Sequence, residues 1–227
     1  MLDETFDALK TYDWGVDPKI LRPLDEAVVA AHGNAAACKV LEDRLIAVLK
    51  TDAPRAAKDA ICRVLRTIGT VASVPALTAL LADDKLSHMA RYALERIPAP
   101  EAGNALRSAL PKAAAKQQIG VLQSLGARHD ATAIPALQVM LGSKDPGVAP
   151  AAARALGALA LPAANKALAS AKPTAAIADA SMACAENLLA GGLKADAKAT
   201  YQRVLASTPA KPVQFAATLG LKACAGG

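Results

Sequence analysis

The chain has 227 residues, of which 53% are hydrophobic, 20% are charged and only 3% are aromatic. This apolar content excludes a disordered chain, and the scarcity of aromatic residues argues against a β-sandwich or β-barrel, so the composition favours an all-α protein rich in Ala and Leu. The formal net charge is +6, but the charge is unevenly distributed. Residues 1–17 hold five acidic side chains against one basic, whereas residues 53–128 hold 11 basic side chains against five acidic ones. The basic region suits an anionic partner, and the alternative is an ordinary basic surface in contact with solvent.

Residues 1–33 are expected to form capping helices. Phe6, Tyr12 and Trp14 supply half of the aromatic side chains. We interpret them as bulk that closes the core of the first repeat, or alternatively as a docking site for a partner. The first residues are acidic and lack the apolar run of a signal peptide, and the most apolar stretch, residues 155–164, is too short to span a bilayer. We therefore expect a soluble, cytoplasmic protein without membrane association, unless an export signal has been removed.

Two interleaved leucine series share one period along the chain. The dipeptide Ala-Leu recurs with a regular spacing at residues 76–77, 105–106, 136–137 and 167–168, and a second series of leucines lies between these positions. The first series is Leu77, Leu106, Leu137 and Leu168, preceded by Leu45, and the second is Leu65, Leu94, Leu125, Leu156 and Leu188. Intervals of 29 to 32 residues predict a repeated two-helix unit whose members bury their apolar faces against their neighbours. The small Ala side chains let the helices approach closely, while the leucines fill the seams.

The turn chemistry agrees with this phase. Residues 74–77 and 134–137 share the pattern of an apolar residue followed by Pro-Ala-Leu, which places proline near a helix start. Acidic turns at residues 83–85 and 143–146 then separate the two helices of a repeat, and Gly69, Gly126 and Gly157 are expected to close or loosen second helices near their ends.

Over residues 34–175 this pattern resembles HEAT-like repeats. The residues that carry the resemblance are Pro-Ala-Leu, then Leu80-Leu81 or Met140-Leu141, an Asp-bearing turn and Ala-Leu in the second helix. The short period is most similar to the repeats of bilin-lyase proteins. One departure is that an Arg stands near the second helix start in Met89-Ala90-Arg91 but not in Val148-Ala149-Pro150. The resemblance implies a right-handed α-α superhelix of about five to six two-helix repeats of about 31 residues.

The sequence pattern of the repeat changes over residues 176–227. Gly192, Ala197, Tyr201 and Pro209, with Leu188 at the usual large-residue position, resemble one tetratricopeptide unit. We interpret this part as a closing helical hairpin followed by one more helix, and we expect one continuous solenoid domain in all.

One column of residues is the first candidate for a binding site. Two positions before each leucine of the second series stands a large polar side chain, about 160° from the core: Arg63, Tyr92, Gln123, Arg154 and Glu186. Further polar residues flank this column on two of the second helices: Arg55, Lys58, Arg66, His88 and Arg91. By the HEAT-like resemblance, second helices form the concave binding surface. The alternative is an ordinary solvated face with local ion pairs.

Catalytic and metal-binding patterns are absent from the sequence. His88 and Glu95 share one helix face but have no accompanying nucleophile, and no phosphate loop, dinucleotide fingerprint or zinc motif occurs. Cys38, Cys62 and Cys184 lie among apolar residues and are expected to be buried free thiols.

The sequence therefore predicts a non-catalytic scaffold, without cofactor or metal, that acts as a monomer. Its expected partner is a protein or peptide of unknown identity, and the basic charge suits an acidic one. The alternative is nucleic-acid binding to phosphates through the basic face of residues 53–128, although aromatic residues for base stacking are scarce there. A bilin-lyase role rests on the resemblance alone.

Overall fold

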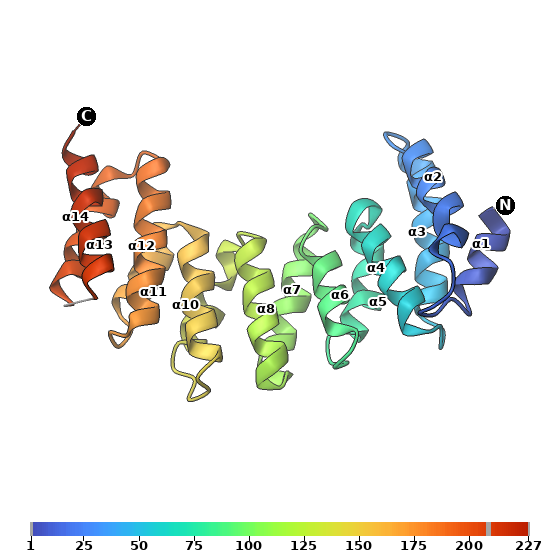
Figure 1. Cartoon of the computed structure of the whole chain (residues 1–227), viewed down its shortest axis with the longest axis horizontal. Coiled ribbons are helices and arrows are strands. Elements are labelled where there is room, and N and C mark those ends of the chain that lie inside the picture. The colour runs from blue at the N-terminus through green and yellow to red at the C-terminus, as the bar shows by residue number, and fades with distance from the viewer. Residues whose placement is uncertain (1, 208–209, 227) are drawn as a thin grey trace. The chain divides into compact units, whose positions relative to one another are not determined.

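Helices make up the regular structure of this chain. A computed structural model describes residues 2–207 and 210–226, and within these residues 14 α-helices and four 3-10 helices (η1–η4) follow one another without a β-strand (Figure 1). The all-α prediction is confirmed. The chain divides into two compact units, residues 1–113 (unit 1) and residues 114–227 (unit 2), and each is described by itself.

Unit 1 begins with a helical cap and continues as paired helices. Its elements are α1 (Leu2–Leu9), η1 (Pro18–Leu21), α2 (Arg22–Ala30), α3 (Ala35–Leu49), α4 (Arg55–Ile68), η2 (Val71–Ser73), α5 (Val74–Ala79), α6 (Ser87–Leu94), α7 (Pro100–Ala109) and η3 (Leu110–Lys112). Helix α4 packs against α3 and α6, and α5 packs against α6 and α7. Helices α4 and α5 thus each contact a sequence neighbour and the equivalent helix of the next repeat, as in a solenoid.

Unit 2 has the same two-layer packing. Its elements are α8 (Ala115–Ala127), η4 (Ala131–Ala133), α9 (Ile134–Met140), α10 (Val148–Leu159), α11 (Pro162–Ala169), α12 (Ala175–Ala190), α13 (Lys194–Ala206) and α14 (Lys211–Ala225). Helices α8, α10, α12 and α14 contact one another in succession, and so do α9, α11 and α13 (Figure 1). The chain is therefore an all-α helical-repeat solenoid. Its handedness, its repeat number and the division into residues 1–33, 34–175 and 176–227 stay predictions.

The leucine series form the core, as predicted. All ten leucines are at most 1% exposed: Leu45, Leu65, Leu77, Leu94, Leu106, Leu125, Leu137, Leu156, Leu168 and Leu188. Fully burying one such side chain contributes on the order of 1.5–3 kcal/mol. A period of about 31 residues therefore brings equivalent leucines to equivalent places between helices.

The predicted turns also occupy equivalent places. Pro75 and Pro135 lie in the first turns of α5 and α9. Before the following second helices, the Asp83 carboxylate accepts backbone N–H bonds from Lys85 and Leu86, and the Asp145 carboxylate accepts them from Gly147 and Val148. These bonds satisfy amides around the helix starts, which explains why each turn carries an aspartate.

The three glycines lie near the ends of second helices, as predicted. Gly69 follows the last residue of α4. Gly126 and Gly157 lie in the last turns of α8 and α10, where a Cβ atom would stand 3.0 Å from the Ala155 Cα and 2.6 Å from the Ala180 carbonyl oxygen. Glycine at these two positions therefore also allows close approach of neighbouring helix backbones, which the sequence pattern did not predict.

The C-terminal hairpin consists of α12 and α13, with α14 packed against both. Ala197 and Tyr201 are buried, and Gly192 has a positive φ of 81° in the connecting turn. Pro209, the fourth residue of the tetratricopeptide pattern, lies outside the described residues. The tetratricopeptide resemblance stays a prediction.

Candidate partner-binding face

Helices α4 and α6 of unit 1 pack side by side and carry most of the predicted site. Seven side chains on these two helices define what we call the basic face: Arg55, Lys58, Arg63, Arg66, His88, Arg91 and Tyr92. Arg55, Arg63 and His88 are exposed, and the other four are half-buried. The predicted role of these side chains in binding a partner stays a prediction.

Arg66 and Tyr92 form a stacked pair between the two helices. The guanidinium carbon of Arg66 lies 4.4 Å from the centroid of the Tyr92 ring. A contact of this kind stabilises by about 0.5–1 kcal/mol at exposed sites and more where it is desolvated. Because Arg66 covers one side of the ring, Tyr92 in this arrangement offers less surface for stacking on a ligand.

Asp59 is a buried carboxylate in this cationic environment, and the sequence reasoning missed it. It is 5% exposed, and within the described residues its Oδ1 atom has no hydrogen-bond partner. Burial raises the pKa of Asp59, while the charges of Arg55, Arg63 and His88 lower it by a smaller amount. A usable signal was present, since Asp59 is the one acidic residue in the 14-residue helix α4.

The Arg91 side chain is more buried than those of Arg55 and Arg63. Within the described residues its Nε atom is buried and has no hydrogen-bond partner. Burial lowers the pKa of Arg91, and the charge of Glu95 opposes that shift. Arg55 and Arg63 therefore present their charge to solvent more fully than Arg91 does.

The other three predicted residues lie in unit 2. Gln123, Arg154 and Glu186 are exposed on α8, α10 and α12, which pack in that order. They form a row that is neutral, positive and negative in turn, which differs in character from the basic face of unit 1.

One comparison with known protein families agrees with this repeat architecture in part of the chain. The family of HEAT repeats matches residues 104–189. Residues 104–189 are therefore similar to HEAT repeats. The crystal structure of an engineered protein matches 97% of the chain over 96% of its own length, at 22% sequence identity and a TM-score of 0.39. The search of curated proteins gave no match. Neither the bilin-lyase subtype nor the tetratricopeptide unit is identified by these comparisons, and both stay predictions.

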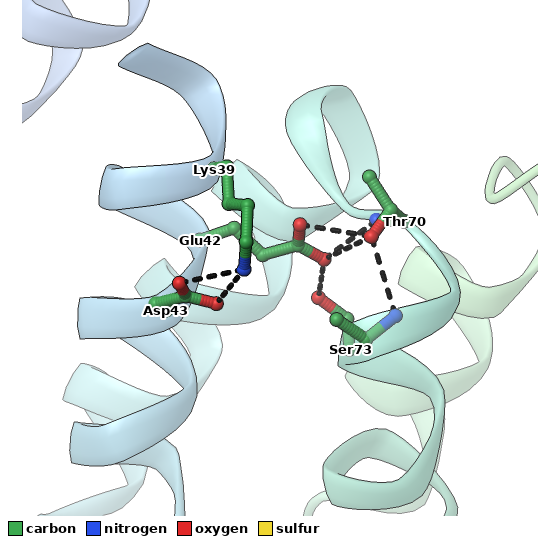
Figure 2. Close-up of polar contacts among 6 residues, drawn as sticks. Lys39, Glu42, Asp43, Thr70 and Ser73 are labelled. Atoms are coloured by element: carbon green, nitrogen blue, oxygen red, sulfur yellow. Dashed lines mark hydrogen bonds and ion pairs between the residues drawn. The ribbon is translucent and has the colours of Figure 1, made fainter. Parts of the chain in front are cut away.

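A buried carboxylate joins successive helix pairs in unit 1. Glu42 on α3 is 1% exposed, and its carboxylate accepts hydrogen bonds from the Thr70 amide at 2.6 Å, from the Thr70 hydroxyl and from the Ser73 hydroxyl at 2.6 Å (Figure 2). Neighbouring Asp43 instead pairs with Lys39 at the surface. Periodicity identifies apolar seams but not long-range polar partners, so the sequence reasoning did not find this contact.

The N-terminal cap contains a cavity of about 660 Å³ beside α4, here called the N-terminal cavity. Its apolar lining includes Trp14, Val16, Val28, Val29 and Val64, and Asp25 and Arg63 are its charged lining residues. Phe6 is buried beneath Arg44, as the capping interpretation requires, but Trp14 is 61% exposed. The aromatic residues of the cap thus divide between the core and the surface.

Metal-binding side chains do not gather in the part of the chain that the structure describes. There, no group of three or more His, Cys, Asp or Glu side chains could hold a metal ion. Burial raises the pKa of the Cys62 thiol to about 12 and that of Cys184 to about 11. Cys38 is only half-buried, contrary to the prediction, because it lies in the first turn of α3. No helix among the described residues has the length and hydrophobicity needed to cross a membrane.

Proposed function

We propose that this helical-repeat protein is a non-catalytic scaffold that binds an acidic segment of a partner protein through the basic face of α4 and α6. HEAT repeats commonly serve as protein-interaction scaffolds. The observation that carries the proposal is the clustering of Arg55, Arg63 and neighbouring cations on two packed helices, where the acidic residue of α4 is buried beneath them. An extended peptide with several carboxylates would neutralise this charge at the surface.

The exposed row of unit 2 is a second element of the proposal. Gln123, Arg154 and Glu186 can hydrogen-bond to a mixed-charge segment, with Arg154 as the cation of the row. The row of unit 2 and the basic face of unit 1 are tested with separate variants, because their contributions to binding are treated as independent.

The test uses a labelled Glu-rich peptide of about 15 residues, with a Lys-rich peptide of equal length as the control ligand, measured by fluorescence anisotropy. R55E/R63E should weaken binding of the Glu-rich peptide by about tenfold or more, since both exposed charges are reversed. K166E/K198E changes the net charge equally at exposed positions of unit 2 outside both rows, and it should bind almost as well as wild type. R154E tests the row of unit 2. Equal weakening by R55E/R63E and K166E/K198E would show that only net charge matters and would reject the face.

Nucleic-acid binding is the competing hypothesis, because the same cations suit phosphates. Duplex and single-stranded DNA should then bind with an affinity that falls steeply with salt, at a slope of about −2 or steeper if two or more duplex phosphates are neutralised. The Arg66 guanidinium covers one side of the Tyr92 ring, which argues against stacking of a nucleic-acid base on Tyr92. If wild type shows no salt-sensitive DNA binding at low ionic strength, this hypothesis is rejected.

A further inference from the structure

The last helix, α14, carries an exposed stripe that nothing in the structure covers. Lys211, Phe215, Leu219 and Lys222 are all exposed, and at about 100° per residue they lie within one sector of the helix. Phe215 is 68% exposed and Leu219 is 48% exposed, whereas the opposite side of α14 packs on α12 and α13. We call these four residues the terminal stripe. It is basic at both ends, apolar in the middle and about 16 Å long.

The N-terminal cavity offers a surface of matching character. Exposed Trp14, Val16 and Val29 line it, and its volume of about 660 Å³ lies within the range of sites that hold large ligands. Asp25 also lines the cavity, and Asp13 and Asp17 flank the lining residues Trp14 and Val16 in sequence. Among the described residues, none of these three aspartates forms an ion pair, in contrast to Asp3 and Asp7, which pair with Arg44 and Lys10.

The charges of the two surfaces are complementary. Residues 2–31 hold seven acidic side chains against three basic ones, whereas residues 210–226 hold two lysines and no acidic side chain. Among the described residues Arg63 is the single cation that lines the cavity, and the three aspartates, which form no ion pair there, outnumber it. Opposite charges around an apolar centre favour both the encounter and one docking register.

We propose that the terminal stripe of one copy docks in the N-terminal cavity of a second copy, with Phe215 and Leu219 against Trp14 and the lysines toward Asp13, Asp17 and Asp25. Each copy supplies a different surface, so the contact is heterologous and leaves one stripe and one cavity free for further copies. This self-association differs from the monomer predicted from the sequence. Arg63 lines the cavity and also belongs to the basic face, but the proposed contacts are made by Trp14 and the three aspartates, so the self-association needs no acidic partner.

Sedimentation velocity at low ionic strength, over protein concentrations up to about 1 mM, is the primary measurement, because small interfaces are weak. The average mass of the wild type should rise with concentration. F215S/L219S and W14S each remove one surface and should stay monomeric when alone. Mixed together, they should form a dimer that does not grow, because one intact stripe meets one intact cavity.

The single Trp of the chain reports on the contact directly. Titration of F215S/L219S with W14S should shift the Trp14 emission to shorter wavelength, since only the former protein contains Trp and its ring would become covered. Circular dichroism checks that both variants keep their helices. K211E/K222E provides an independent disruption, and adding D13K/D17K to the same chain should restore self-association.

Three results would overturn the proposal. The first is a wild type that stays monomeric at all concentrations. The second is association that survives F215S/L219S, W14S or K211E/K222E. The third is a mixture of the two blocked variants that shows neither a dimer nor a change in Trp14 emission, which would indicate contact between identical surfaces.

Discussion

At the scale of single residues, two buried carboxylates in unit 1 have opposite surroundings. Glu42 accepts hydrogen bonds from the Thr70 amide and from the hydroxyls of Thr70 and Ser73. Asp59 has cations nearby but, among the described residues, no hydrogen-bond partner for its Oδ1 atom. A buried polar group stabilises a fold only where its hydrogen bonds are made. We therefore expect Glu42 to stabilise unit 1 and ionised Asp59 to destabilise it.

Replacement of Glu42 should therefore be costly. E42A leaves the Thr70 amide and the Ser73 hydroxyl without their acceptor, and we expect a loss of about 1–3 kcal/mol in the free energy of unfolding, measured in urea. The matched control is D43A on the same helix, whose carboxylate pairs with Lys39 at the surface. Its effect should be much smaller, and equal losses for the two variants would contradict the role of Glu42.

Asp59 predicts a particular dependence of stability on pH. Because burial raises its pKa above the usual value of 3.8, its contribution to stability is present below that value and is lost as the pH rises through the raised pKa. D59N cannot ionise, so its stability relative to wild type should increase between about pH 3 and neutral pH.

For Asp83 the expected change of stability with pH has the opposite sign, because the backbone N–H groups of Lys85 and Leu86 lower its pKa. The loss in D83N should be largest at neutral pH and shrink in acid, and parallel curves for both variants would contradict this assignment.

At the scale of helices, small residues set how closely neighbouring repeats approach. The Gly157 backbone in α10 lies against Ala180 of α12, and Gly126 in α8 lies against Ala155 of α10. Alanine usually favours a helix over glycine by about 1 kcal/mol, so propensity and packing oppose each other at these positions.

Packing should prevail at Gly157. We expect G157A to destabilise unit 2, because the new Cβ would meet the Ala180 carbonyl oxygen at 2.6 Å and force the helices apart. Gly142 is a suitable control, since a Cβ there meets its nearest atom at an ordinary 3.4 Å. Thermal unfolding of both variants provides the measurement. A stabilised G157A would show that the helices move apart without cost.

At the scale of the whole chain, the two compact units should respond separately to a core defect. Leu65 and Leu156 are equivalent, fully buried members of the second leucine series in unit 1 and unit 2. Stability in repeat proteins is largely a sum of local and nearest-neighbour contributions, so a cavity should weaken the nearest helices most.

Hydrogen exchange tests this expectation. L65A should cost about 2–5 kcal/mol and reduce amide protection in α3, α4 and α6 before that of α12. L156A should reduce protection first in α8, α10 and α12. Uniform loss of protection throughout the chain in both variants would indicate that the units unfold as one.

Periodicity alone determined the helical repeat, the buried leucine series, the proline-led first helices and the outward position of Arg63 and Gln123, because these features depend on spacing within one or two helices. Only the tertiary structure decided that Gly126 and Gly157 are packing positions, that Glu42 binds Thr70 and Ser73, that Asp59 lies buried among cations and that Phe215 is uncovered. These features depend on which atoms of distant residues meet. A local repeat in sequence specifies the direction in which a side chain points, but not the partner that it finds there.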